Sequence, residues 1–239
     1  MGTGAVGRHR DATDFGAMTL LFGMSNVVRH FAGWLIGLAL AATASSVNGQ
    51  SNAPDLSAEN WRDAPLVEGL DAARALRAAG EPVYRLSLEK ERLREIPAEV
   101  FALEELRELV LNRNRLTSLD GEWGQVAGLV CLRASDNQIQ AIPDPILRLE
   151  RLEILDLGNN ELERIPLDID DLRALRELIL WSNPIAHYPA SLGNMRSLER
   201  LDLMHNVMTA EEITAVKLWV RPEVDLILPA PCGCEIEAD

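Results

Sequence analysis

Aliphatic residues recur along residues 83–208 with a fixed period of 23 residues. Each repeat has apolar residues at its first and fourth positions, and all copies but one have a leucine at the sixth. The core-facing fourth and sixth residues are thus separated by a fifth residue on the other face. A period of two is typical of a strand with one buried face. The pattern therefore predicts six short strands, one in each repeat. The first positions are Val83, Leu106, Leu129, Leu152, Leu175 and Leu198.

Asparagine occupies the ninth position of five repeats, just after the predicted strand, whereas the first repeat has Glu91 there. An amide at this bend can bond backbone groups of its own turn and of the neighbouring repeat, which would otherwise be left without partners. We therefore predict a structural ladder of stacked amides. Its members are Asn114, Asn137, Asn160, Asn183 and Asn206.

The full repeat reads LxxLxLxxNxLxxIPxxIxxLxx, with the Ile-Pro pair at residues 96–97, 142–143 and 165–166. This pattern resembles the leucine-rich repeat family, in the 23-residue form found in Ras-group and Ras-suppressor-like proteins. One such repeat cannot bury its own leucines, but a stack of repeats can. The expected fold is an α/β repeat solenoid, a curved array with a parallel concave sheet and helical caps at both ends.

The segments on either side of residues 83–208 are predicted to form those caps. Residues 50–82 are the expected N-terminal helical cap, because apolar residues stand at helical spacing across residues 55–79, from Leu66 to Leu76. Residues 209–228 are the expected C-terminal cap. Thr209 and Glu212 form a capping box that opens a helix, and a degenerate strand follows with Val224 and Leu226 at the fourth and sixth positions. Residues 229–239 are expected to be a flexible tail.

Residues 1–49 are read as an N-terminal extension that contains a signal peptide. Arg29 precedes an apolar run over residues 31–42, and small residues follow at 42–44. This order is typical of a secretory signal, and the run is too short to span a bilayer. We expect export to the periplasm or the medium, with no membrane span after cleavage; an uncleaved chain would be cytoplasmic. The start codon could be Met1, Met18 or Met24.

Composition and motifs bear on the chemistry. The formal charge of −14 disfavours nucleic acid as a partner, because binding the phosphate backbone needs clustered basic residues. The sequence shows no spacing typical of a nucleophile, a metal site or a phosphate loop. We therefore expect no catalytic residues, no metal and no cofactor. Cys232 and Cys234 leave three possibilities open: a local disulfide, a metal site completed by outside ligands, or thiol exchange.

Binding is the remaining possibility. The third, fifth and seventh residues of each repeat point away from the leucine core and form the concave face. An apolar band with a charged rim and a tryptophan crosses this face, as in protein-binding patches. Gly158 beside the tryptophan is expected to leave room for a partner's side chain. The predicted partner-binding residues are Cys131, Arg133, Ile154, Asp156, Ile179, Trp181, Met204 and His205.

The sequence thus predicts a monomeric, exported, non-catalytic module that binds another protein through its concave face. The Ras-group resemblance implies an alternative, an intracellular scaffold or regulator of a small GTPase. Carbohydrate binding is a further alternative, because Trp181 could stack on a sugar ring. A thiol-dependent enzyme using the C-terminal cysteines, or a stalk without a partner surface, would also be compatible with the sequence.

Overall fold

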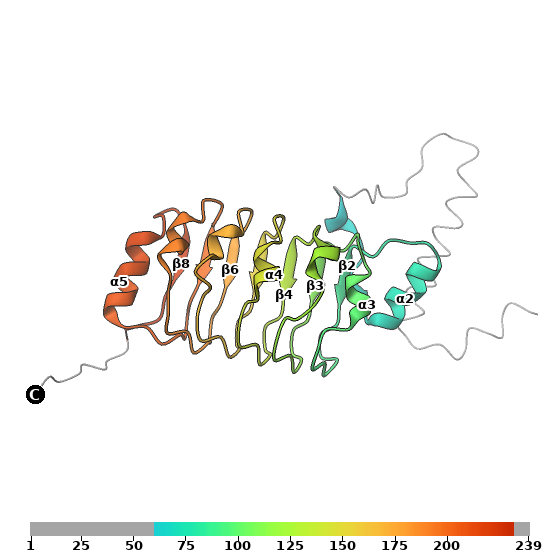
Figure 1. Cartoon of the computed structure of the whole chain (residues 1–239), viewed down its shortest axis with the longest axis horizontal. Coiled ribbons are helices and arrows are strands. Elements are labelled where there is room, and N and C mark those ends of the chain that lie inside the picture. Colours follow the sequence, from blue (N-terminus) through green and yellow to red (C-terminus); the bar gives the residue numbers. More distant parts are fainter. Residues whose placement is uncertain (1–59, 232–239) are drawn as a thin grey trace, which may run out of the picture. The chain divides into compact units, whose positions relative to one another are not determined.

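A computed structural model describes residues 60–231, in which eight short strands form one open parallel sheet (Figure 1). The strands pair in sequence order, so each is hydrogen-bonded to the strands of the preceding and following turns. The predicted solenoid with a parallel sheet is confirmed. The strands are β1 (Val67–Glu68), β2 (Arg85–Ser87), β3 (Glu108–Val110), β4 (Cys131–Arg133), β5 (Ile154–Asp156), β6 (Glu177–Ile179), β7 (Arg200–Asp202) and β8 (Asp225–Ile227).

The 23-residue period is also the register of the sheet. Leu86 pairs with Leu109, Leu109 with Leu132, and the series continues to Leu201. Each of these fourth-position leucines is 0% exposed. Because each of the strands β2–β7 is only three residues long, its one buried leucine packs against those of the neighbouring turns, and the stack makes a continuous core.

Short helices form the return paths between strands. A proline precedes three of them and ends the extended backbone before the turn. Trp123 takes the place of an aliphatic residue in this layer; it is 0% exposed and meets Phe101 edge-on at 5.2 Å. The return-path helices are α3 (Ala98–Phe101), η2 (Trp123–Val126), α4 (Asp144–Leu147), η3 (Ile169–Asp171) and η4 (Ala190–Asn194).

The N-terminal flank differs from the predicted helix over residues 55–79. Its described part begins with the short helix η1 (Trp61–Asp63), continues as strand β1 and becomes helical only in α2 (Leu70–Ala78). Gly69 separates strand from helix with a φ of 78°, a left-handed conformation that favours glycine. Leu66, which the prediction placed on the buried face of a helix, is 37% exposed.

The C-terminal flank has the predicted capping box and helix α5 (Ala210–Trp219). The Glu212 N–H donates to the Thr209 hydroxyl, and the Thr209 N–H donates to the Glu212 carboxylate. The register predicted for β8 is wrong, because Leu226, and not Val224, pairs with Leu201. Leu226 follows Leu201 by 25 residues, since a helical return path covers less distance per residue than an extended one.

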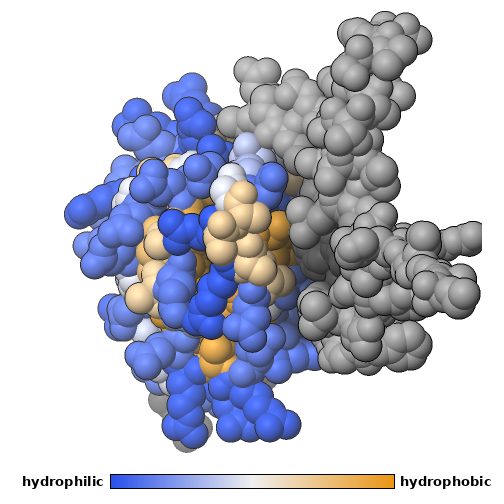
Figure 2. Space-filling model, turned by 90° about the vertical axis from the view of Figure 1, so that its right-hand side faces the viewer, coloured by the Kyte–Doolittle hydropathy of each residue, from blue (hydrophilic) through white to orange (hydrophobic). Residues whose placement is uncertain are grey.

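The two flanking helices lie at opposite ends of the array in Figure 1, and their capping role stays a prediction. Figure 2 views the end at which α2 lies and shows apolar surface in the middle of that end, surrounded by hydrophilic side chains. On α2 itself, Ala73 and Leu76 are buried. No helix within residues 60–231 has the length and apolar character needed to cross a bilayer.

Candidate binding surface on the concave sheet

The predicted partner-binding residues lie on strands β4–β7 and in the turns that follow them. Ile154 and Ile179 project from β5 and β6, and Trp181 and Met204 follow β6 and β7; all four side chains are half-buried. His205 is exposed. The face therefore presents partly accessible apolar groups, as the pattern of polar and apolar positions predicts.

Cys131 is an exception, and its prediction as an accessible contact residue is wrong. The residue is 2% exposed, and its Sγ lies 3.9 Å from a carboxylate oxygen of Glu108. Burial raises the pKa of the Cys131 thiol to about 12, with nearby Arg133 acting in the opposite direction. A thiol of this kind stays protonated at neutral pH and is unreactive.

The space predicted beside Gly158 is filled by the chain itself. A Cβ placed on Gly158 would lie 2.0 Å from Nε1 of Trp181, so the indole rests directly on the glycine backbone. The predicted recess for a partner's side chain is therefore wrong. The glycine instead lets the large ring approach the backbone of the sheet closely.

Asp156 is the notable charged group of this surface. Its Oδ1 accepts a hydrogen bond from the Gly158 N–H at 3.1 Å, and none of the ion pairs within residues 60–231 includes it. Burial raises the pKa of the Asp156 carboxyl; the Gly158 hydrogen bond and Arg133 oppose that effect, and Asp136 and Asp202 add to it. The chain thus has a partly desolvated carboxylate that makes no ion pair among the described residues.

This arrangement predicts that Asp156→Asn raises stability at neutral pH. A raised folded-state pKa means that the folded chain binds the proton more tightly than the unfolded chain, so stability falls as pH rises above the unfolded value of about 3.9. Asparagine keeps an acceptor for Gly158 and removes the charge. Thermal melting at neutral and at acidic pH should show a gain at neutral pH that disappears in acid.

Asp202→Asn is the matched control. Asp202 accepts the Met204 N–H at 3.0 Å in the same way, but it also faces Arg200 at 3.8 Å. The same substitution there removes an ion pair and should not stabilise. A loss of stability in Asp156→Asn at neutral pH would contradict the account.

The ladder asparagines hold the turns that carry this surface. Nδ2 of Asn160 donates to the carbonyls of Leu157 and Ala134, both at 3.0 Å, and to Gly158 at 3.2 Å. Its Oδ1 accepts from the Ile139 N–H at 3.0 Å. One side chain thereby joins two successive repeats. The asparagines with this full set of bonds are Asn114, Asn137, Asn160 and Asn183.

Asn206 ends the ladder with an incomplete set. Its Nδ2 donates to Leu180 and Leu203, both at 2.9 Å. Its buried Oδ1 has no hydrogen-bond partner among the described residues. The matching N–H would belong to Ile185, which follows a proline and whose carbonyl accepts the Tyr188 hydroxyl.

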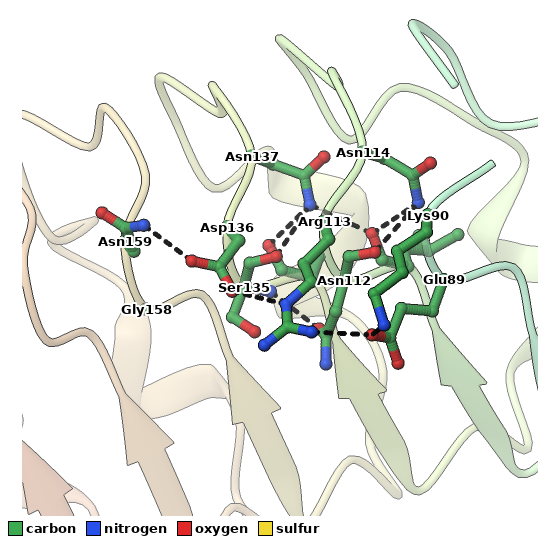
Figure 3. A network of polar contacts seen from close by, with 12 residues as sticks. Glu89, Lys90, Asn112, Arg113, Asn114, Ser135, Asp136, Asn137, Gly158 and Asn159 are labelled. Carbon is green, nitrogen blue, oxygen red and sulfur yellow. Dashed lines mark hydrogen bonds and ion pairs between the residues drawn. The ribbon is translucent and has the colours of Figure 1, made fainter. Parts of the chain in front are cut away.

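A second polar row runs beside the ladder, at the eighth position of each repeat (Figure 3). Glu89 contacts Arg113 at 3.5 Å, Arg113 contacts Asp136 at 3.6 Å, and Asn159 donates to Asp136 at 2.7 Å. Of this row, the sequence pattern indicated only His205. All its members have positive φ: Lys90, Arg113, Asp136, Asn159, Ser182 and His205.

The structure also adds residues that the sequence did not assign to the surface. The segment around η1 lies against the first half of the concave face, where Arg62 pairs with Glu153 at 3.0 Å across 91 residues of sequence. Arg85 donates to the carbonyls of Arg62 and Ala64. No periodic signal marks these contacts, because the segment lies outside the repeats.

Residues 60–231 contain no group of three or more histidine, cysteine, aspartate or glutamate side chains that could hold a metal ion. Cys232 and Cys234 lie outside the described residues, as does the predicted signal segment 24–49.

The profile of the leucine rich repeat family matches residues 81–139 and 127–185. These matches cover the central strands, and the sheet and asparagine ladder have the arrangement that the repeat requires. The central part of the chain, residues 81–185, therefore consists of leucine-rich repeats. Members of this family are in general non-catalytic interaction modules. A comparison with curated proteins gives no match.

Solved structures support the fold. A leucine-rich repeat protein of Leptospira interrogans is 24% identical, with a TM-score of 0.57 over 69% of this chain and 47% of its own. An internalin of Listeria monocytogenes is 20% identical, with a TM-score of 0.50 over 70% of this chain and 52% of its own. A chain in the structure of a TLR13–ssRNA13 complex is 21% identical to this one, with a TM-score of 0.53 over 61% of this chain and 21% of its own. The chain spans about half the length of the first two.

Proposed function

We propose that the chain is a non-catalytic module that binds a protein partner through the second half of its concave face. The proposal rests mainly on Trp181, whose half-buried indole is held against the Gly158 backbone. An aromatic ring fixed in advance loses little conformational freedom when a partner covers it, and such rings are common hot spots of interfaces.

The neighbouring groups give this surface a mixed character. Ile179 and Met204 add half-buried apolar area, and Asp156 adds a carboxylate without an ion pair among the described residues. A partner that places a cation beside Asp156 would offset the desolvation cost of this carboxylate in the free chain. The surface therefore suits a protein with apolar and basic side chains.

The negative charge of the chain favours such a partner over nucleic acid. A formal charge of −14 repels a phosphate backbone. The TLR13 structure contains RNA, but at this level of identity the likeness supports the fold alone. Carbohydrate binding and a small GTPase partner are alternatives that a capture experiment would reveal.

We further propose that the chain is exported, on the basis of the charged, apolar and small-residue order of residues 24–49. N-terminal sequencing of the protein from its source cells tests this proposal. A start near Ser45 or Gln50 would support export. An intact residue 24–49 segment would contradict it and would favour the intracellular scaffold.

Trp181→Asp is expected to lower partner affinity by about 2 kcal/mol or more, which is roughly 30-fold. The chain serves as bait on envelope and medium fractions, and captured proteins are identified by mass spectrometry and then titrated. Leu218→Asp is the matched control, since Leu218 is 81% exposed on α5, outside the concave face. Equal affinity of all three baits for every captured protein would refute binding at Trp181.

A further inference from the structure

The segment around η1 turns the first half of the concave sheet into a pocket. It is anchored through side-chain and main-chain groups: Arg62 Nη2 meets Glu153 at 3.0 Å, and Arg85 Nη1 donates to the carbonyls of Arg62 and Ala64 at 3.2 and 3.1 Å. Trp61 is 7% exposed, so its ring is packed against the array. The result is a pocket of about 270 Å³, large enough for one side chain of a partner.

Apolar and basic side chains line the pocket together. Arg62 lies over the Trp61 ring, 4.6 Å from its centroid. Arg85 and Arg133 also line the pocket, and both lie within 4 Å of the Glu108 carboxylate. The residues that line the pocket are Trp61, Arg62, Arg85, Glu108, Val130, Cys131, Arg133 and Ile154.

Positive charge exceeds negative charge at this pocket. Glu108 binds Nε of Arg85 at 2.6 Å, but it lies 3.8 Å from Nε of Arg133. The second distance is longer than a hydrogen bond, so guanidinium N–H groups of Arg133 are available to another acceptor. Glu153 lies outside the lining and balances Arg62. Three guanidinium groups and one carboxylate thus line the pocket of a chain that is otherwise acidic.

We propose that this pocket binds an acidic side chain of the partner protein. The methylene groups of that side chain would lie on Val130, Ile154 and Trp61, and its carboxylate would accept N–H groups of Arg133 and Arg85. Charge-assisted bonds from guanidinium to carboxylate are among the stronger hydrogen bonds in proteins. The inference rests on the proposed function. It adds an acidic side chain of the partner, bound in this pocket, to the basic side chain of the partner that is proposed to contact Asp156.

The test uses butyrate, which has an aliphatic stem and a carboxylate, and butyramide, its neutral counterpart. The full chain, labelled with ¹⁵N at arginine, is titrated with each at constant ionic strength, and the side-chain Nε–H resonances are followed by NMR. Butyrate should shift the Arg85 and Arg133 resonances with saturation, and butyramide should not. Arg133→Gln should weaken butyrate binding at least tenfold.

Arg176→Gln is the control variant, because Arg176 pairs with Glu199 outside the pocket and should leave butyrate binding unchanged. Equal shifts with butyrate and butyramide, no saturable shift, or unchanged affinity in Arg133→Gln would each overturn the proposal. Failure of butyrate together with partner capture that depends on Trp181 would reject the pocket alone. Butyrate binding together with capture that ignores Trp181 would reject the proposed surface at Trp181 and keep the pocket.

Discussion

Asn160→Ala is expected to lower the free energy of unfolding by about 3 kcal/mol. The amide of Asn160 makes four hydrogen bonds to backbone groups of two successive repeats. Alanine would leave the buried Ile139 N–H without its acceptor, whereas the Ala134 carbonyl keeps its hydrogen bond from Nδ2 of Asn137 at 3.1 Å. Leaving a buried backbone N–H unsatisfied costs about 1–3 kcal/mol, and the loss of the three other hydrogen bonds of Asn160 adds to it.

Asn206→Ala provides the internal comparison. Asn206 keeps the donor bonds of the ladder, but its Oδ1 accepts none among the described residues. The loss should therefore be smaller than at Asn160 by about the cost of one orphaned N–H, roughly 1–2 kcal/mol. Urea unfolding of the full chain, followed by circular dichroism, measures both variants. Equal losses of unfolding free energy in the two variants would contradict the stabilising role assigned to the Oδ1 hydrogen bond of the ladder.

Gly158→Ala is expected to cost about 2 kcal/mol of stability and to displace Trp181. The new Cβ would fall 2.0 Å from Nε1 of the indole, well inside contact distance, so the ring must leave the sheet surface. Forcing extra atoms into a packed site costs about 1–3 kcal/mol. The displaced ring should also lower partner affinity about as strongly as Trp181→Asp does, although no charge is added.

Tryptophan fluorescence and partner titration measure these two effects together. The emission of Gly158→Ala should move to longer wavelength as the ring becomes hydrated. Gly124→Ala is the control, because a Cβ there meets no heavy atom within 4 Å outside its chain neighbours. Unchanged emission and unchanged partner affinity in Gly158→Ala would contradict the proposal that the partner binds the indole in this position.

The central fold could be predicted from the sequence because one physical rule repeats. A leucine every 23 residues must meet its equivalents in adjacent turns, and Leu86, Leu109 and Leu132 pair as that rule requires. Prediction failed at the ends, where the rule no longer applies. Leu226 takes the place expected of Val224 because a helix replaces the usual return path. Strand β1 was missed, although Gly69 beside it marks a break in the helical pattern.

The concave surface could be predicted only in outline. Alternation along the strands correctly indicated which residues leave the core, but it could not indicate what covers them afterwards. Cys131 is buried although its position in the repeat points outward. Trp181 fills the space that Gly158 had been expected to leave open. Contacts of Trp61 and Arg62 across the sheet depend on tertiary structure alone, so no local pattern marks them.

Site-specific photo-cross-linking tests the central claim, binding through the concave face, most directly. A photoreactive phenylalanine analogue replaces Ile179 in one bait and Leu167 in another; Ile179 projects from β6, whereas Leu167 is 77% exposed in a return path. Both baits are irradiated with the captured partner. Cross-linking from position 179 and none from position 167 is the predicted result. Cross-linking from position 167 alone would place the partner on another face and contradict the account.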